Sequence, residues 1–205
     1  MKRGPRIAVG IALALAIAAA ATSWLVLGHR AKEHKPGRDA AFLRAQADNV
    51  KALQADKIDM REHSGLTDID LEVLPDLANL RDLNLDHAPI TDAGLAELGQ
   101  LAGLKMLRLD TTGVTDAGLA HLRAFPGLLW LSLYQTGITD AGLAKLKPLT
   151  ALQHLSLDKT LVTDEGLKLL SEFPSLRYVS VWETQVTDAG IDALKEKRPM
   201  LRINR

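Results

Sequence analysis

Leucine recurs along most of this chain at a fixed spacing, and that spacing predicts the architecture. The letters T-D-x-G-[LI] occur five times at intervals of 24 residues, beginning at Thr91, Thr115, Thr139, Thr163 and Thr187. In register each unit reads L-x-x-[LV]-x-[LV]-x-x-x-x-[IV]-T-D-x-G-[LI]-x-x-L, and the units begin at Leu80, Leu104, Leu128, Leu152 and Leu176. A period of this length is typical of stacked repeats, because one unit cannot bury its apolar face alone.

Within each unit the pattern changes from strand-like alternation to helical spacing. Leu or Val at positions four and six predicts a short strand with one buried face. Thr at position twelve is a preferred helix N-cap, and Asp at position thirteen suits the positive end of a helix. Apolar residues at positions sixteen, nineteen and, in most units, twenty-two follow helical spacing. Each unit is therefore predicted to be a strand, a turn, a short helix and a return, coiling in the right-handed sense.

The two ends of the array depart from this pattern. Residues 39–55 are predicted to form a helix that covers the amino-terminal end of the core, with Leu43, Ala47, Val50 and Leu53 on its apolar face. Residues 58–77 match an incomplete earlier unit that contains one extra residue. At the other end, residues 200–203 are predicted to begin a last strand without a helix. Charged side chains would protect that open edge, namely Arg198, Arg202 and Arg205.

The register resembles the leucine-rich repeat family, in particular its 24-residue bacterial type with T-D-x-G-L. The resemblance extends over about residues 57–205, where five units agree at seven or more positions. It implies an α/β fold: a right-handed solenoid that forms a short arc of about seven strands, with a concave parallel sheet and convex helices. We therefore divide the chain into a basic amino-terminal segment and linker (1–38), a capping helix (39–56) and a repeat domain (57–205).

The amino-terminal segment contains an apolar run that is long enough to cross a membrane. Residues 7–27 carry no charge, and basic residues flank them on both sides. A cleaved secretory signal, with its A-x-A site within residues 18–21, is the alternative. The run continues past that site through Trp24, which favours an uncleaved transmembrane helix. We expect a single-pass membrane protein whose repeat domain is extracytoplasmic, with secretion after signal cleavage as the alternative.

Charge and cysteine content narrow the function classes. Residues 1–38 carry seven Lys or Arg and one acid, whereas residues 39–205 carry 18 Lys or Arg and 24 Asp or Glu. An acidic repeat domain cannot neutralise phosphates with clustered basic side chains, so we expect no nucleic-acid partner. The chain has no cysteine, which excludes disulfides, thiolate metal sites and a cysteine nucleophile.

The side chains that point away from the core identify a candidate binding face. They occupy positions three, five, seven and eight of each unit and form the predicted concave face. Every Trp and Tyr beyond residue 27 lies there: Trp130, Tyr134, Tyr178 and Trp182. Trp and Tyr are enriched at binding hot spots, so we expect these residues, with His154 among them, to be the centre of a ligand site. Six further residues complete it: Met106, Arg108, Asp110, Asp158, Lys159 and Glu183. The alternative is that these large side chains only pack on one another and stiffen the sheet.

No pattern in the chain predicts catalysis, a metal site or a cofactor. The six histidines lack the spacing of a metalloprotease motif, and the chain lacks a phosphate-binding loop. The repeated Asp of T-D-x-G is read as a helix-start residue rather than a calcium ligand, and the repeated Gly as a position where helix and strand layers approach closely. We therefore predict a non-catalytic, membrane-tethered module that binds a protein, peptide or glycan. The alternative is a structural or self-associating scaffold.

Overall fold

The computed structural model describes residues 38–53, 56–61, 63–74 and 77–205. The fold described below is that of the second of the two units into which the chain divides, Pro36–Arg205. The transmembrane helix predicted over residues 7–27 lies outside the described residues. Within the described ranges, no helix combines the length and the apolar character that crossing a membrane requires.

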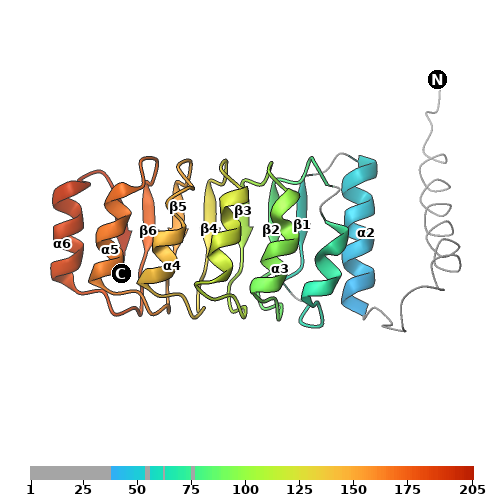
Figure 1. The fold of residues 1–205 in the computed structure, drawn as a ribbon, viewed down its shortest axis with the longest axis horizontal. Helices are drawn as coiled ribbons and strands as arrows, with labels where there is room; N and C mark the ends of the chain where they lie inside the picture. The colour runs from blue at the N-terminus through green and yellow to red at the C-terminus, as the bar shows by residue number, and fades with distance from the viewer. Residues whose placement is uncertain (1–37, 54–55, 62, 75–76) are drawn as a thin grey trace, which may run out of the picture. The chain divides into compact units, whose positions relative to one another are not determined.

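A parallel sheet of seven short strands in chain order forms one layer of the repeat domain (Figure 1). The strands are β1 (Lys57–Asp59), β2 (Asp82–Asn84), β3 (Met106–Arg108), β4 (Trp130–Ser132), β5 (His154–Ser156), β6 (Tyr178–Ser180) and β7 (Arg202–Asn204). From β2 onward each strand pairs with residues 24 positions later, as Leu83 does with Leu107. This pairing confirms the predicted repeat register and the parallel strands.

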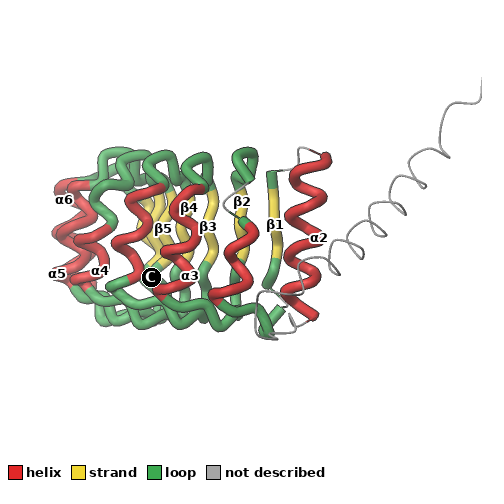
Figure 2. The backbone as a smooth tube through the Cα atoms, turned by 45° about the vertical axis from the view of Figure 1, so that its right-hand side comes forward, coloured by secondary structure: helices red, strands yellow, loops and turns green. Residues whose placement is uncertain are grey.

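Helices, most of them short, form the second layer, which covers one face of the sheet (Figure 2). They are α2 (Arg38–Leu53), η1 (Asp68–Val73), α3 (Asp92–Glu97), η2 (Leu98–Gln100), η3 (Gly118–Ala124), α4 (Asp140–Lys145), α5 (Asp164–Leu169), η4 (Leu170–Glu172) and α6 (Asp188–Lys197), where η denotes a 3₁₀ helix. Helices α3, α4, α5 and α6 each begin after an extended Thr whose hydroxyl accepts a backbone N–H of the first turn. The predicted N-cap role of Thr is therefore confirmed at these four positions.

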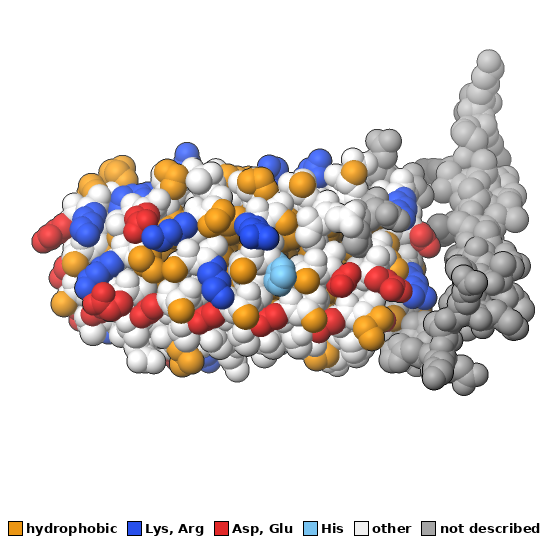
Figure 3. All heavy atoms as spheres, viewed as in Figure 1, with side chains coloured by type: hydrophobic (Ala, Val, Ile, Leu, Met, Phe, Trp, Pro, Cys, Tyr) orange, Lys and Arg blue, Asp and Glu red, His pale blue; other side chains and the backbone are white. Residues whose placement is uncertain are grey.

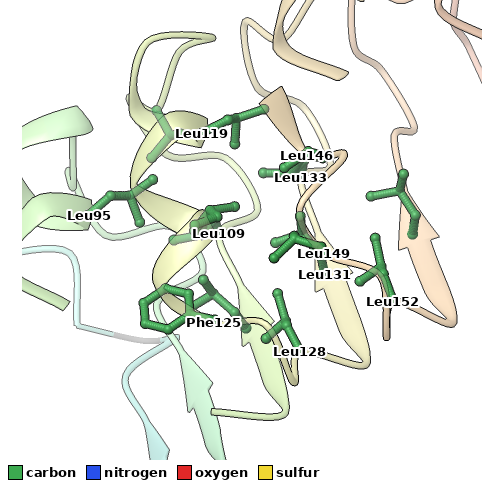
Figure 4. Close-up of a cluster of buried hydrophobic side chains, with 14 of the residues drawn as sticks. Leu95, Leu109, Leu119, Phe125, Leu128, Leu131, Leu133, Leu146, Leu149 and Leu152 are labelled. Atoms are coloured by element: carbon green, nitrogen blue, oxygen red, sulfur yellow. The ribbon is translucent and has the colours of Figure 1, made fainter. Parts of the chain in front are cut away.

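The core fills the space between the two layers. The inward strand residues Leu83, Leu107, Leu131 and Leu155 are all 0% exposed. Figure 4 shows leucines of neighbouring units lying between strands and helices in one cluster with Phe125, which is also fully buried. Burying one such side chain contributes about 2 kcal/mol, so the repeated leucines supply most of the stabilisation of the stack.

The amino-terminal end of the core is covered by α2, as predicted. Leu43, Ala47 and Val50 belong to the buried cluster. The carboxylate of Asp39 fixes the following loop, because it accepts the N–H of Gly65 at 2.6 Å and lies 3.0 Å from the His63 ring nitrogen. In the incomplete first unit, Ile58 pairs with Leu83, which is 25 rather than 24 residues later, so the loop after β1 holds the extra residue.

The carboxyl-terminal end differs from the prediction in two respects. The last strand begins at Arg202, and Met200 is 90% exposed while Leu201 occupies the buried place beside it. The prediction that Arg198 protects the sheet edge is wrong. Its guanidinium donates to the carbonyl oxygens of Phe173 and Leu176, and it therefore closes the turn of the preceding unit. Arg205 forms an ion pair with Asp188 at the start of α6.

The repeated Asp has a role that the sequence did not reveal, because it holds two units together. In five successive units, from Asp68 to Asp164, the carboxylate accepts both the backbone N–H and the hydroxyl of the Thr that precedes the next helix. The N–H···O distances are 2.8–2.9 Å and the O–H···O distances 2.5–2.7 Å. The pairs, which we call the repeat clasps, are Asp68–Thr91, Asp92–Thr115, Asp116–Thr139, Asp140–Thr163 and Asp164–Thr187.

The repeated Gly leaves room for the clasp rather than for the strand layer. A Cβ atom on Gly142 would lie 2.2 Å from Asp116 Oδ1, and Gly94, Gly118, Gly166 and Gly190 make equivalent approaches to the preceding Asp, at 2.1–2.3 Å. The predicted contact of these glycines with the strands is therefore wrong. The residues of T-D-x-G therefore act together across two units. The Asp of one unit accepts hydrogen bonds from the Thr of the following unit, and the Gly of that following unit leaves space for the carboxylate.

Candidate binding face

The strand face consists of the side chains at positions three, five, seven and eight, and the sheet register places equal positions side by side. Position three forms one row across the sheet: Lys57, Asp82, Met106, Trp130, His154, Tyr178 and Arg202. Sequence analysis identified the middle of this row. It did not identify the two ends, because Lys57 and Arg202 belong to the irregular terminal units.

Three rings of this row lie against one another, the first pair stacked and the second tilted. The rings of Trp130 and His154 have centroids 4.6 Å apart and an interplanar angle of 19°. His154 and Tyr178 follow at 6.1 Å and 37°. We call these three residues the aromatic row. Each side chain is half-buried, so mutual packing, the alternative reading of these side chains, accounts for part of their surface and leaves the remainder open to solvent.

The other two aromatic residues are joined by a lysine. The Lys159 ammonium lies 5.4 Å from the centroid of the Tyr134 ring and 5.2 Å from that of Trp182. Glu183 lies 3.5 Å from the same ammonium. Contact with the Tyr134 hydroxyl, and secondarily the charge of Glu183, raise the pKa of Lys159 above its usual 10.5. Trp182 remains 44% exposed, the most open aromatic side chain of this face.

Position eight does not continue the strand as the sequence suggested. Its five residues have φ between 51° and 63°, in the left-handed region, namely His87, Thr111, Gln135, Lys159 and Glu183. Such a conformation costs about 1 kcal/mol or more for a residue with a side chain. The backbone compensates, because the N–H of Lys159 donates to the Trp182 carbonyl at 2.8 Å, and the three preceding units repeat this bond. The turn directs Lys159 over the aromatic side chains of its neighbours.

Two of the predicted site residues, Asp110 and Asp158, position the aromatic side chains. Asp110 accepts the N–H of Tyr134 at 3.0 Å and the hydroxyl of Ser132 at 2.5 Å. Asp158 accepts the N–H of Trp182 at 2.6 Å. Each aspartate therefore fixes the backbone of the aromatic residue at the same position of the next unit. Asp110 and Asp158 were predicted as site residues from their place on the face, but the sequence does not reveal this bond.

The amino-terminal half of the face contains a polar hollow of about 340 Å³. Its lining residues come from β1 to β4 and the turns that follow: Lys57, Asp59, Arg61, Asn84, Asp86, Arg108, Asp110, Trp130 and Ser132. Asp82 accepts from Arg108 at 2.9 Å and lies 3.3 Å from the Lys57 ammonium. Asp59 pairs with Arg61 at 2.7 Å. Trp130 belongs both to this hollow and to the aromatic row.

Asp86 is the perturbed acid of the hollow. Burial raises its pKa above the ordinary 3.8, and the Asp110 carboxylate adds to the rise, against the hydrogen bond from the Asp110 N–H. Asp86 was not among the site residues predicted from sequence, because the hollow depends on the irregular first unit. Within the described ranges, no group of three or more His, Asp or Glu side chains is placed to hold a metal ion.

The face therefore divides into two parts. The aromatic half contains the aromatic row and the group around Lys159, and it includes most of the residues predicted from sequence. The charged half contains the hollow, with the predicted Arg108 and Asp110. Met106 is half-buried and stands between Asp82 and Trp130 in its row, where the two halves meet.

Comparisons with known proteins agree with this architecture. A family model described as a leucine-rich repeat matches residues 77–99. The chain is similar to internalin C2 from Listeria monocytogenes, with 26% identity over 60% of this chain and 51% of that chain and a TM-score of 0.50. It shares its fold with a leucine-rich repeat protein of Leptospira interrogans, with 21% identity, 65% and 33% coverage and a TM-score of 0.52. The chain thus spans about half and one third of these two proteins. No curated protein sequence matches it.

Proposed function

Because the chain is a leucine-rich repeat protein, we propose that it is a recognition module that binds a protein or peptide on its strand face. Leucine-rich repeat domains generally mediate protein–protein interactions and are typically non-catalytic scaffolds. The assignment to the 24-residue bacterial type rests on the sequence register alone and is part of this proposal.

The observation that carries the proposal is the concentration of aromatic side chains on one half of the strand face. Trp130, Tyr134, Tyr178 and Trp182 all lie there, each partly open to solvent and held by a neighbouring ring, aspartate or lysine. Pre-positioned aromatic side chains lose little conformational entropy when a partner binds, which is why they dominate the energetics of protein interfaces.

A selection experiment tests this function. Random twelve-residue peptides displayed on phage would be selected on the full-length chain, and the affinity of the enriched peptides measured by calorimetry. Trp182→Ala and Trp130→Ala should each weaken binding by about 2 kcal/mol, or roughly thirtyfold. Leu161→Ala is the control, because Leu161 is an apolar side chain that is 52% exposed in the loop that leads to α5 and is not among the predicted site residues. Enriched peptides whose binding is unaffected by either tryptophan change would refute the proposed site. If the chain selects no peptide but binds glycans on an array, the partner would be a glycan rather than a protein or peptide.

A scaffold that associates with itself is the second candidate function. It is favoured by β7, which pairs only with β6 among the strands that the structure describes, and by Met200, which is 90% exposed beside that strand. Sedimentation of the full-length chain distinguishes the two. Association that Met200→Ser abolishes, in a chain that selects no peptide, would support the scaffold.

We also propose that the module is displayed outside the cytoplasm and tethered by residues 7–27. The uncharged length of that segment supports the proposal. Protease added to intact cells should digest the repeat domain. Full protection of an expressed protein would contradict export, and a mature amino terminus near residue 21 would replace the tether by secretion.

A further inference from the structure

Three cations and three carboxylates line the polar hollow, and Asp82 beside it adds a fourth carboxylate. The three cations have acidic neighbours, since Lys57 and Arg108 share Asp82, and Arg61 pairs with Asp59. Asp86 and Asp110 have only neutral hydrogen-bond donors: the Asp110 N–H for Asp86, and the Ser132 hydroxyl and Tyr134 N–H for Asp110. Among the described residues, neither carboxylate forms a salt bridge. Counted together with Asp82, the hollow therefore has one carboxylate more than it has cations, and the two carboxylates without an ion pair line the same hollow as Trp130.

The opposite end of the aromatic row carries the opposite charge. Arg202 stands next to Tyr178 in the register of β6 and β7, and its side chain is exposed. It forms no salt bridge with any residue that the structure describes. Arg205, by contrast, is neutralised by Asp188. The strand face thus has an acidic pole at the hollow, an aromatic centre and a basic pole at β7.

The distance between the two poles suits a short extended peptide. Asp110 follows β3 and Arg202 begins β7, so four strand spacings of about 4.8 Å separate them across the sheet, or about 19 Å. Asp110 also lies four positions further along its unit than the row of Arg202, which adds about 13 Å along the strand direction. The diagonal is about 23 Å, the length of roughly seven extended residues.

We propose that the peptide bound by this face is extended across the strands, with a basic side chain at Asp86 and Asp110, an apolar or aromatic segment on the aromatic row, and an acidic side chain at Arg202. This inference rests on the proposed function and specifies the partner. A guanidinium or ammonium group in the hollow meets two carboxylates, and Trp130 lines the same hollow, where a cation–π contact is favourable. Complementary poles fix the orientation of the peptide more than they increase its affinity.

The same peptide selection tests the inference when it is repeated on charge variants of the full-length chain. Wild type should enrich peptides with Arg or Lys about six to seven positions from Asp or Glu. The variant with Asp86→Asn and Asp110→Asn should lose the basic preference and keep the acidic one. Arg202→Gln should lose only the acidic preference, and Arg202→Glu should select a basic residue in its place. Asp192→Asn and Arg123→Gln are matched controls, because both residues are exposed on the helix side.

Affinities of one selected peptide then separate the possible failures. Replacing the basic residue of that peptide by Gln should weaken its binding to wild type at least tenfold. The same replacement should not weaken its binding to the variant with Asp86→Asn and Asp110→Asn. Peptides that bind through Trp130 and Trp182 but show no charge preference would overturn this inference and leave the proposed function intact. Peptides insensitive to both tryptophans, or no enriched peptide, would overturn both. A variant that fails to fold is recognised by its thermal melting curve, and Asp110→Ser, which keeps a short polar side chain, then takes its place.

Discussion

The helix-start edge and the strand face of this protein are built by opposite rules. At the helix-start edge, the same three residue types recur in every regular unit and make the same hydrogen bonds, from Asp68–Thr91 to Asp164–Thr187. Acidic side chains accordingly recur along the helix side (Figure 3). On the strand face, the corresponding positions differ from unit to unit, and position three alone reads Asp, Met, Trp, His and Tyr through the regular units.

The difference shows where each kind of stabilisation originates. A clasp joins one unit to the next, so its geometry must repeat wherever units stack. A contact on the strand face, such as the stack of Trp130 on His154, involves only its own neighbours. Substitutions at the helix-start edge should therefore act on folding, and substitutions on the strand face mainly on recognition.

The largest expected effect comes from filling a clasp. Gly142→Ala would normally favour a helix by about 1 kcal/mol, but its Cβ would lie 2.2 Å from Asp116 Oδ1 and 3.0 Å from a methyl group of Ile138. We expect a loss of about 3 kcal/mol in the free energy of unfolding, because the clasp must open. Urea denaturation measures it. Gly137→Ala is the control, because nothing lies within 4 Å of its added Cβ.

A double-mutant cycle sharpens this result. Asp116→Ala alone should cost about 2 kcal/mol, since it leaves the N–H and hydroxyl of Thr139 without their acceptor. Adding Gly142→Ala to Asp116→Ala should then cost much less than it does in wild type, because the carboxylate no longer occupies the space. Strict additivity of the two changes would show that the glycine serves another purpose.

A smaller effect on stability is expected from the strand face. Trp130→Ala should reduce the free energy of unfolding by about 1 kcal/mol, because it removes the stack on His154 from a half-buried position. Trp182→Ala should reduce it by about 0.5 kcal/mol or less, because that side chain is 44% exposed. Thermal melting of both variants measures these differences. A loss at Trp130 as large as that at Gly142 would remove the distinction between the two regions.

The smallest effect concerns the response to acid. Hydrogen bonds from the Thr187 hydroxyl, and next from its N–H, lower the pKa of Asp164 below 3.8. Its contribution to stability is therefore present above pH 3.8 and is lost as the pH falls through the lowered value. Asp86 behaves in the opposite way, because its raised pKa means that ionisation opposes folding as the pH rises above 3.8. Thr187→Val should move the pKa of Asp164 towards 3.8 in a carboxylate NMR titration, and an unchanged value would contradict the role of the hydroxyl.

The leucine register was sufficient to predict most of the fold. It gave the parallel strands, the inward Leu83 and its equivalents, the Thr N-caps and the covering role of Leu43 and Val50. It also placed Trp130, His154 and Tyr178 in one row. These features follow from local periodicity, which a single sequence displays directly.

The remaining features depend on contacts between units. The acceptor role of Asp92 towards Thr115 becomes visible only when two units are stacked, although both residues are conspicuous in the sequence. The left-handed turn at Lys159 could not be predicted, because neither its residue type nor its neighbours require it. The polar hollow depends on Lys57 and Arg61 from a unit with an inserted residue, so register alone could not align them with Arg108.

The forward-reaching clasp also makes the array editable. Every clasp joins an Asp to a Thr with the same geometry, so excising residues 104–127 would present Asp92 to Thr139 as it is now presented to Thr115. The shortened chain would keep a repeat clasp between each pair of units, and Trp130 would become the direct neighbour of Asp82 in the sheet. Whole units can thus be removed, duplicated or exchanged to change the residues of the strand face without redesigning the contacts between units.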